Sequence, residues 1–263
     1  MRIAGATVLL TGVTGGIGRA LALKLSGRGT RLVVTGRHAE TLAPLAAQLG
    51  ARPVVADLAD PEQVTALAEQ CADVDILLAN AALPASGDLL DYTPAQIERA
   101  LTVNLSSPIL LARFLAPRMV SAGSGHLAFV GSLSGKAATP YSSLYTATKF
   151  GLRGFSHSLR QDLHGTGVGV SLIQPGFVRE AGMFAATGAE VPSGVGTVSP
   201  DQVADAVLRA IEENRCEVNV APAKLRLRCA VAGQFPGYAE RSAGRGGANP
   251  AVDRIVEAQR ASR

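Results

Sequence analysis

A tyrosine and a lysine stand four residues apart in this chain, at Tyr145 and Lys149. If the segment is helical, both side chains project from one face. An ammonium group beside a phenol stabilises the phenolate and lowers the phenol's pKa, so such a tyrosine can pass a proton to or from an oxygen atom. Moving a tyrosine pKa from about 10 to near 7 takes roughly 4 kcal/mol. Exposed helices often carry this spacing, so the pair alone is a weak indication of a catalytic site. Ser132, thirteen residues upstream of the tyrosine, makes the pattern more specific.

A glycine-rich turn, TGVTGGIG, follows the first apolar stretch of the chain and opens the first predicted helix. Gly12 allows the tight turn, Gly16 lets the backbone approach a pyrophosphate, and Gly18 lets helix and strand pack closely. The free N–H groups and the dipole of the helix N-terminus favour phosphate. Strand, turn and helix are in register, so we predict a dinucleotide site rather than a purely structural turn. Its contributors from this turn are Gly12, Thr14, Gly15, Gly16, Ile17 and Gly18.

The end of the second predicted strand bears on the choice of cofactor. A carboxylate there would accept hydrogen bonds from the adenosine ribose and repel a 2′-phosphate, but this chain has Gly36 followed by Arg37. A guanidinium without a neighbouring acid favours a phosphorylated ribose, and the Thr14 hydroxyl could add a contact. We therefore predict NADP(H) rather than NAD(H), the alternative being that Arg37 is simply solvated.

Apolar runs and amphipathic stretches alternate along the chain, which predicts an α/β fold. Such alternation favours a Rossmann-type, doubly wound parallel sheet of about seven strands with helices on both faces and the ligand at the carboxyl ends of the strands. Asp60, Thr93 and Ser199 each precede a proline, the pattern of a helix N-cap. The expected strands are 6–11, 31–35, 53–56, 75–79, 126–131, 168–173 and 216–221. The expected helices are 16–28, 39–49, 61–72, 94–121, 145–163 and 200–214.

The 263 residues carry a formal net charge of +4 and are 47% hydrophobic, which suits one domain over residues 1–263 with a core at 5–222. A Gly-, Ala- and Pro-rich segment at 180–198 is expected to be a substrate lid, and 223–263 a basic C-terminal tail. The spacing of cysteines and histidines predicts no disulfide and no metal site. No signal peptide, membrane-length apolar run or basic block with interleaved aromatics is visible, so we expect a cytoplasmic protein that binds no nucleic acid.

The glycine turn with Ser132, Tyr145 and Lys149 resembles the short-chain dehydrogenase/reductase superfamily, in particular its shorter single-domain subgroup with TGxxxGxG and YxxxK. The resemblance covers roughly residues 5–222 and implies strand order 3-2-1-4-5-6-7 and a homodimer or homotetramer assembled through two long helices. It implies that Tyr145 is the acid/base, that Lys149 lowers its pKa and holds the nicotinamide ribose, and that Ser132 binds the substrate oxygen. It further implies that Asn104 fixes a water molecule that links Lys149 to solvent.

The same resemblance extends to further cofactor contacts. Those it implies are Asp57 and Leu58 at the adenine, Asn80 and Ala81 in the slot of the NNAG motif, Tyr145 and Lys149, and Pro175 with Gly176 beside the nicotinamide. Ala79 and Ala82 depart from the NNAG pattern. Glu180 stands where the family often has a threonine for the carboxamide, so the backbone of Val178 is the alternative anchor.

These residues predict an NADP(H)-dependent oxidoreductase that interconverts a carbonyl and a secondary alcohol. A non-catalytic NADP-sensing or scaffold protein on the same fold is the alternative, and an epimerase or dehydratase that uses the nicotinamide transiently is a third hypothesis. The expected walls of the substrate site, 83–89, 135–144 and 180–198, carry few charges, which favours a neutral or lipophilic small-molecule substrate.

Overall fold

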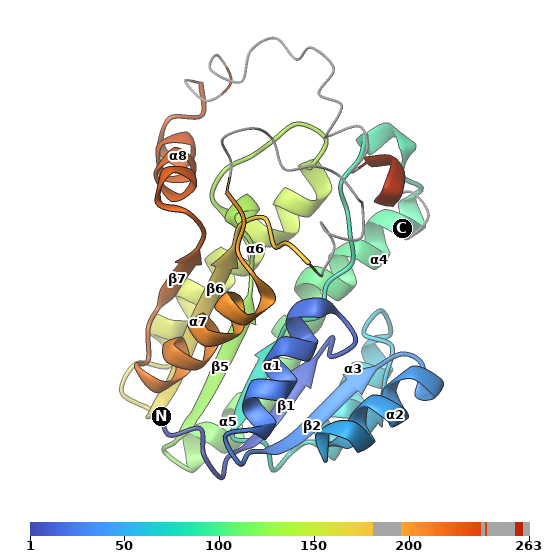
Figure 1. Cartoon of the computed structure of the whole chain (residues 1–263), viewed down its shortest axis with the longest axis vertical. Coiled ribbons are helices and arrows are strands. Elements are labelled where there is room, and N and C mark those ends of the chain that lie inside the picture. The colour runs from blue at the N-terminus through green and yellow to red at the C-terminus, as the bar shows by residue number, and fades with distance from the viewer. Residues whose placement is uncertain (181–195, 238–239, 241–255, 260–263) are drawn as a thin grey trace.

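Seven parallel strands form one sheet in the order β3-β2-β1-β4-β5-β6-β7, which confirms the predicted fold class and strand order. The computed structural model describes residues 1–180, 196–237, 240 and 256–259. Figure 1 shows the strands rising side by side toward the end at which the loops gather. The strands are β1 (Thr7–Thr11), β2 (Arg31–Gly36), β3 (Arg52–Val55), β4 (Ile76–Ala79), β5 (Gly125–Val130), β6 (Val168–Pro175) and β7 (Glu217–Val220).

Helices cover both faces of the sheet, so the central strands are buried on both sides. One apolar core joins the sheet to α1, α2 and α7 through Leu21, Leu42 and Val203. The other joins it to α3, α5 and α6 through Val64, Leu115 and Leu152. The helices on these faces are α1 (Gly16–Ser26), α2 (Ala39–Leu49), α3 (Pro61–Gln70), α4 (Pro94–Leu101), α5 (Ser107–Ser121), α6 (Ser143–Asp162) and α7 (Pro200–Glu212).

The three predicted N-caps are confirmed. The Asp60 carboxylate accepts the Glu62 N–H at 2.9 Å at the start of α3. Thr93 and Ser199 form capping boxes with the glutamine three residues further on, at the starts of α4 and α7. These short-range bonds place the helix starts where the sequence predicts them.

α4 and α5 form one helical stretch, Pro94–Ser121, joined by the π-helical segment η2 (Thr102–Ser106). By length and composition alone this stretch could cross a membrane, with a mean hydropathy of 1.2 in its most apolar window, which was not expected from the sequence. Half of that window is buried inside the protein, as in the core helix of a folded domain, so it is weak evidence for a membrane span.

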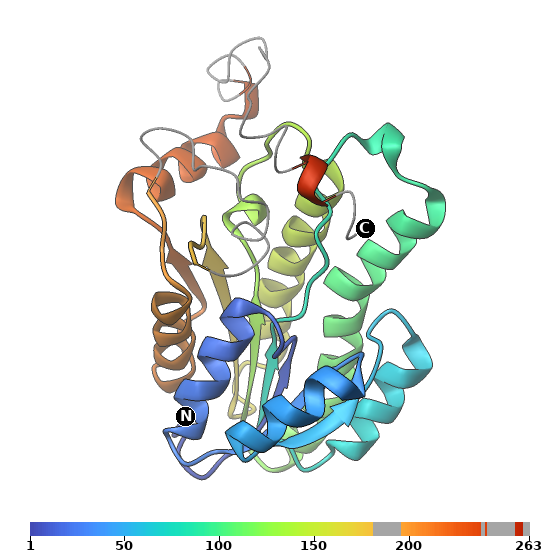
Figure 2. The same ribbon diagram turned by 45° about the vertical axis from the view of Figure 1, so that its right-hand side comes forward.

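Beyond β7 the chain forms α8 (Ala223–Gln234), a helix that the sequence did not predict. Residues 181–195, most of the predicted lid, and much of the basic C-terminal tail predicted at 223–263 lie outside the described residues. Residues 256–259 are helical and lie beside the loops above the sheet (Figure 2). There the Gln259 side chain is buried and accepts the Ser86 N–H at 3.2 Å.

Candidate active site

A cavity of about 250 Å³ opens at the carboxyl end of β1, where the strand order turns from β1 to β4. In doubly wound sheets this switch point is where nucleotides bind. The cavity brings together most of the residues predicted for the adenosine and pyrophosphate half of the cofactor. Its walls include Gly12, Thr14, Gly15, Gly16, Ile17, Gly18, Arg37, Asp57, Leu58, Asn80 and Ala81.

The glycine turn is held in a form that only glycine fits. Gly12 has a φ of +68°, and a Cβ there would lie 2.7 Å from the Ala81 Cα. A Cβ on Gly18 would lie 2.1 Å from the Gly12 carbonyl oxygen. The Asn80 amide donates to the carbonyl oxygens of Thr11 and Gly12, both at 3.1 Å. Asn80 therefore lines the cavity by fastening the turn.

The chemistry of the turn fits a pyrophosphate. The N-cap residue of α1, Gly15, has no side chain that could occupy the first N–H groups of the helix, and the first turn has no acidic residue. The N–H groups of Gly16, Ile17 and Gly18 have no acceptor within the helix, because first-turn donors never do. They face the cavity with the positive end of the helix dipole, an arrangement that binds anionic oxygens.

Two arginines and one aspartate meet at the adenosine end of this cavity. Arg37 and Asp57 both line it, as predicted. Arg99 of α4 reaches Asp57 with 3.2 Å between Nη2 and Oδ2, a contact that the sequence analysis missed. Partial burial acts to raise the pKa of Asp57, but the Ala59 amide, Arg99 and the charge of Arg37 together lower it. The carboxylate is therefore ionised and neutralised, and the local charge of the cavity is positive.

The predicted catalytic side chains come from two neighbouring elements, the end of β5 and helix α6. Ser132 follows β5 and caps the short helix η3 (Leu133–Gly135), accepting the Ser134 N–H at 3.1 Å. Tyr145 and Lys149 lie one turn apart on α6, with the ammonium 5.5 Å from the centre of the phenol ring. Lys149 is buried and donates to the Val130 carbonyl at 3.1 Å. This bond fastens the helix to the strand that presents Ser132.

The electrostatics of this trio differ from the expectation. Burial raises the pKa of Tyr145 to about 12, although a hydrogen bond with Ser132 acts to lower it. Burial also lowers the pKa of Lys149 to about 8. The predicted lowering of the tyrosine pKa is thus wrong for the protein alone, because the cost of burying a phenolate exceeds the effect of the hydrogen bond with Ser132. At neutral pH the site holds a protonated phenol beside a mostly charged lysine.

Asn104 lies within the π-helical segment η2, where the extra residue in the turn redirects a buried side chain. Its side-chain amide makes two hydrogen bonds to the backbone of Leu83: it accepts the Leu83 N–H at 2.6 Å and donates to the Leu83 carbonyl at 3.0 Å. Leu83 in turn lines the nucleotide cavity. Asn104 therefore shapes the loop after β4. The water-mediated link to Lys149 that the resemblance implies stays a prediction.

The loop after β6 begins beside the short helix that Ser132 caps. Pro175 ends β6, and a Cβ on Gly176 would lie 3.5 Å from the Leu133 side chain, next to Ser132. Val178 is buried and forms an isolated bridge with Val198. Glu180 is exposed and binds its neighbour Arg179 at 2.7 Å. The backbone of Val178 as the carboxamide anchor stays a prediction.

The loops expected as substrate walls are tied to one another around Tyr145. The Gly87 N–H donates to the Tyr141 carbonyl at 2.6 Å, and the Tyr145 N–H donates to the Ala85 carbonyl at 3.3 Å. The buried side chain of Gln259, near the C-terminus, accepts the N–H of Ser86 in the same loop. The start of α6 and the loop after β4 therefore form one continuous wall.

These observations define a class of protein: a nucleotide-binding α/β protein with a Ser-Tyr-Lys group at the strand ends next to its dinucleotide site. Comparison with known proteins identifies the family. The model of the short chain dehydrogenases matches residues 6–191, and the chain belongs to this family. It is an oxidoreductase of the short-chain dehydrogenase/reductase type, acting on CH–OH or C=O groups with a nicotinamide cofactor.

Among its relatives is the ketoacyl reductase HetN of Nostoc sp., which is 34% identical over 227 residues, covering 83% of this chain and 79% of the relative. A short-chain dehydrogenase from Sphingobium yanoikuyae in complex with NADPH shares the fold with a TM-score of 0.77 at 28% identity, covering 93% of this chain and 99% of that one. A metagenomic short-chain oxidoreductase in complex with NADP gives a TM-score of 0.71 at 31% identity, covering 85% and 99%.

Proposed function

We propose that this protein is an NADP(H)-dependent reductase or dehydrogenase of a carbonyl/secondary-alcohol pair in which Tyr145 is the acid/base. The observation that carries the proposal is the position of the Ser-Tyr-Lys group. Asn104 holds Leu83, which lines the nucleotide cavity, and Tyr145 binds the backbone of Ala85 two residues further on. One short loop therefore joins the cavity to the proton-transfer group.

The bound nicotinamide supplies the hydride in such a reaction. Tyr145, protonated at neutral pH, suits the donation of a proton to a carbonyl oxygen during reduction. The Ser132 hydroxyl, already bonded to the phenol, is placed to donate to the same oxygen and to stabilise the negative charge that develops there. Lys149, with a pKa of about 8, can restore the proton of the phenol near neutral pH.

The preference for NADP(H) over NAD(H) is supported by the charges at the adenosine end. Gly36 leaves no acid at the end of β2, Arg37 lines the cavity, and Arg99 neutralises Asp57. A 2′-phosphate would meet two guanidinium groups and one paired carboxylate there. The complexes of the two structural relatives with NADPH and NADP agree with this preference.

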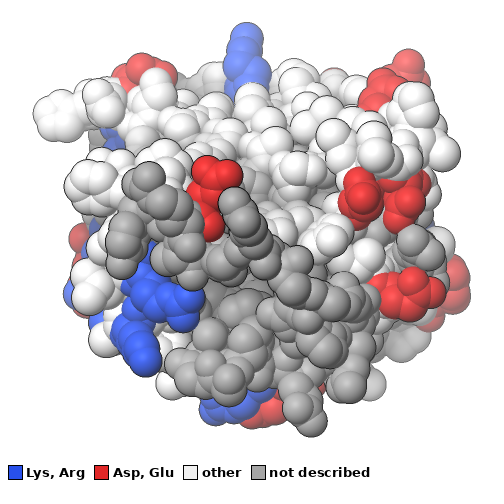
Figure 3. Space-filling model, turned by 90° about the horizontal axis from the view of Figure 1, so that it is seen from above, with Lys and Arg blue, Asp and Glu red and all other residues white. Residues whose placement is uncertain are grey.

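The substrate that we propose is a neutral or lipophilic carbonyl compound. Figure 3 looks onto the end of the molecule at the top of Figure 1, and uncharged side chains dominate the described part of that surface. A surface of this kind suits an uncharged ligand better than a polyanion. Exposed Phe114 and Val120 on α5 and Phe150 on α6 also support a homodimer or homotetramer that pairs through these helices.

The test of the proposed reaction is Tyr145→Phe, which removes the hydroxyl and keeps the ring. We expect turnover in NADPH-driven carbonyl reduction to fall by roughly 10²- to 10⁴-fold while the binding of NADPH stays largely intact. Tyr92→Phe is the comparison variant: it removes a buried hydroxyl that bonds the Ser86 carbonyl at 3.1 Å, so it reports the effect of loosening the same wall while the proton donor is kept. Near wild-type turnover in Tyr145→Phe would refute the acid/base assignment.

Substrates can be sought by following NADPH oxidation with ketones, aldehydes, quinones, steroids and 3-oxoacyl thioesters. Activity with one class and not the others would define the carbonyl group that the loops accept. Tight NADPH binding without turnover of any class would favour the non-catalytic sensing protein over the enzyme.

A further inference from the structure

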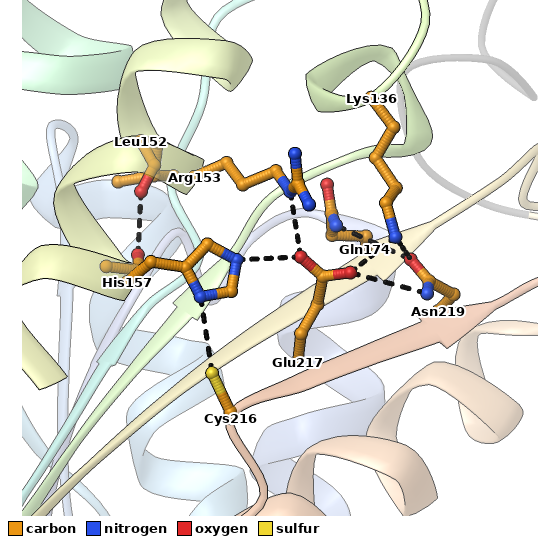
Figure 4. A network of polar contacts seen from close by, with 9 residues as sticks. Lys136, Leu152, Arg153, His157, Gln174, Cys216, Glu217 and Asn219 are labelled. Carbon is orange, nitrogen blue, oxygen red and sulfur yellow. Dashed lines mark hydrogen bonds and ion pairs between the residues drawn. The ribbon is translucent and has the colours of Figure 1, made fainter. Parts of the chain in front are cut away.

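A second group of reactive side chains lies on the outer edge of the sheet, outside the nucleotide cavity (Figure 4). The thiol of Cys216 lies 3.2 Å from Nδ1 of His157. The other ring nitrogen, Nε2, lies 2.9 Å from a carboxylate oxygen of Glu217. Cysteine, imidazole and carboxylate thus stand in line, the arrangement in which a base oriented by a third group activates a nucleophile.

The carboxylate of this group is fixed and ionised. Arg153 donates to Glu217 at 2.8 Å and Lys136 at 2.5 Å, in addition to the contact with His157. Burial acts to raise the pKa of Glu217, but the hydrogen bonds from Arg153, Lys136 and His157 outweigh it and lower the pKa to about 2. At neutral pH Glu217 can therefore only accept hydrogen bonds.

An acceptor at Nε2 determines the tautomer of the imidazole. Nε2 must carry the proton that points at Glu217, so in the neutral ring Nδ1 has a free lone pair. That lone pair faces the sulfur of Cys216, and the thiol can donate its proton to it. If the ring is instead protonated at both nitrogens, Nδ1–H stabilises a thiolate. Either state makes the sulfur a better nucleophile.

We propose that Cys216 is a nucleophilic thiol activated by His157, and that it forms mixed disulfides with small anionic disulfides. The thiol is exposed to solvent. Three arginines belong to the same region: Arg215 precedes Cys216 in the chain, Arg153 shares the Glu217 carboxylate with His157, and Arg160 donates to the Asn214 carbonyl. Two carboxylates, Glu213 and Glu217, are each paired with one or more of the cations in this region, so a negatively charged partner is favoured.

The exchange conserves atoms and electrons. The thiol proton of Cys216 passes to Nδ1 of His157 as the sulfur attacks one sulfur of the small disulfide. A new S–S bond forms, the original S–S bond breaks, and the departing thiolate takes the proton from His157. The sulfur of Cys216 is oxidised and the departing sulfur is reduced, so no other oxidant is needed.

The remaining chemistry of the chain singles out this thiol. Cys71 is buried, and Cys229 is only partly exposed; burial raises the pKa of both thiols. Among the described residues no group of three or more His, Cys, Asp and Glu side chains is suited to hold a metal ion. The line of three residues around Cys216 is therefore better explained as thiol activation than as a set of metal ligands.

The experiment uses the reduced full-length protein and two probes, dithiobis(nitrobenzoate) and oxidised glutathione, with the modified cysteine located by peptide mass spectrometry. We expect Cys216 to react on the order of tenfold faster than Cys229 and than a small free thiol under the same conditions. His157→Gln should slow Cys216 by about tenfold, because the glutamine amide can still donate to Glu217 but cannot accept the thiol proton. Cys216→Ser should abolish the fast phase.

His164→Gln is the matched control, since it removes an exposed imidazole near the end of the same helix and should leave the rate at Cys216 unchanged. Unchanged thermal unfolding of His157→Gln would separate lost activation from misfolding. The proposal is overturned if Cys216 reacts no faster than a free thiol, or if its rate in His157→Gln equals that in the wild type.

Discussion

The adenosine end of the cavity allows a quantitative prediction about cofactor choice. Arg99 pairs with Asp57 at 3.2 Å, and the two side chains are 36% and 32% exposed. An ion pair between partly exposed side chains of this kind is worth about 1 kcal/mol. Arg99→Ala would leave an unpaired carboxylate where we place the 2′-phosphate, so we expect NADPH to bind about fivefold more weakly. Arg37→Ala removes a charge-assisted hydrogen bond to the phosphate and should cost about 1.5–3 kcal/mol, or roughly 10- to 150-fold.

Both variants should leave the affinity for NADH almost unchanged, because NADH has no 2′-phosphate. The chain has no tryptophan, so the assay is calorimetry or the fluorescence of the reduced nicotinamide itself. Arg118→Ala is the control, as Arg118 lies further along the same helical stretch and pairs with Asp75 at 3.7 Å outside the cavity. An equal loss of affinity for NADPH and NADH in Arg37→Ala would refute the assignment of the phosphate site.

A double-mutant cycle then separates two roles for Arg99. If Arg99 acts by neutralising Asp57, the loss of NADPH affinity in Arg99→Ala should disappear when Asp57 is also replaced by asparagine. If Arg99 binds the phosphate directly, the loss should persist in the Asp57→Asn background. A stronger affinity for NADPH in Asp57→Asn alone would show that the carboxylate opposes the phosphate even when it is paired.

Two further predictions concern stability. Gly12→Ala should destabilise the protein by several kcal/mol and weaken NADPH binding, because the new Cβ would lie 2.7 Å from the Ala81 backbone. Gly29→Ala is the control, since Gly29 has a similar φ of +70° but nothing within 4 Å of the added Cβ. It should lower the free energy of unfolding by only about 1 kcal/mol and leave NADPH binding intact. Burial lowers the pKa of His126 to about 3 from 6.5, so only the unfolded state takes up this proton as the pH falls below 6.5. The free energy of unfolding should then fall by about 1.4 kcal/mol per pH unit. Urea midpoints from pH 6.5 to 4.5, above the titration of Glu217, should show this slope and His126→Gln should flatten it; an equal slope in both proteins would contradict the assignment.

The elements and their order could be predicted because the signals are local. Apolar runs such as 168–173 became strands, and the caps at Thr93 and Ser199 started helices where expected. The glycine turn could be read as a nucleotide site because its geometry depends on adjacent residues. α8 was missed because its apolar residues show no helical periodicity and, within the described chain, none of them is buried.

Only those parts of the site that belong to local sequence motifs could be predicted. The pairing of Arg99 with Asp57 joins residues 42 positions apart on different elements, and no local pattern indicates it. The pKa of Tyr145 also depends on the whole fold, since burial raises it and spacing to a lysine does not measure burial. The sequence alone therefore did not indicate which residues far apart in the chain meet in the fold, or how deeply each side chain is buried.

Helix α6, which carries Tyr145 and Lys149, also contacts the edge strand β7 of the sheet. Tyr145, Lys149, Arg153 and His157 follow one another at four-residue spacing, so they form one stripe along α6. The upper half of the stripe meets Ser132 and β5, and the lower half meets Glu217 on β7. Glu217 also binds Lys136, which directly follows η3, the short helix that Ser132 caps. The Glu217 carboxylate on the edge strand thus binds both α6, which carries Tyr145, and the residue that follows η3, which Ser132 caps. Cys216 is the neighbour of Glu217 in the chain, so the proposed reactive thiol lies next to the contact that holds these two elements together.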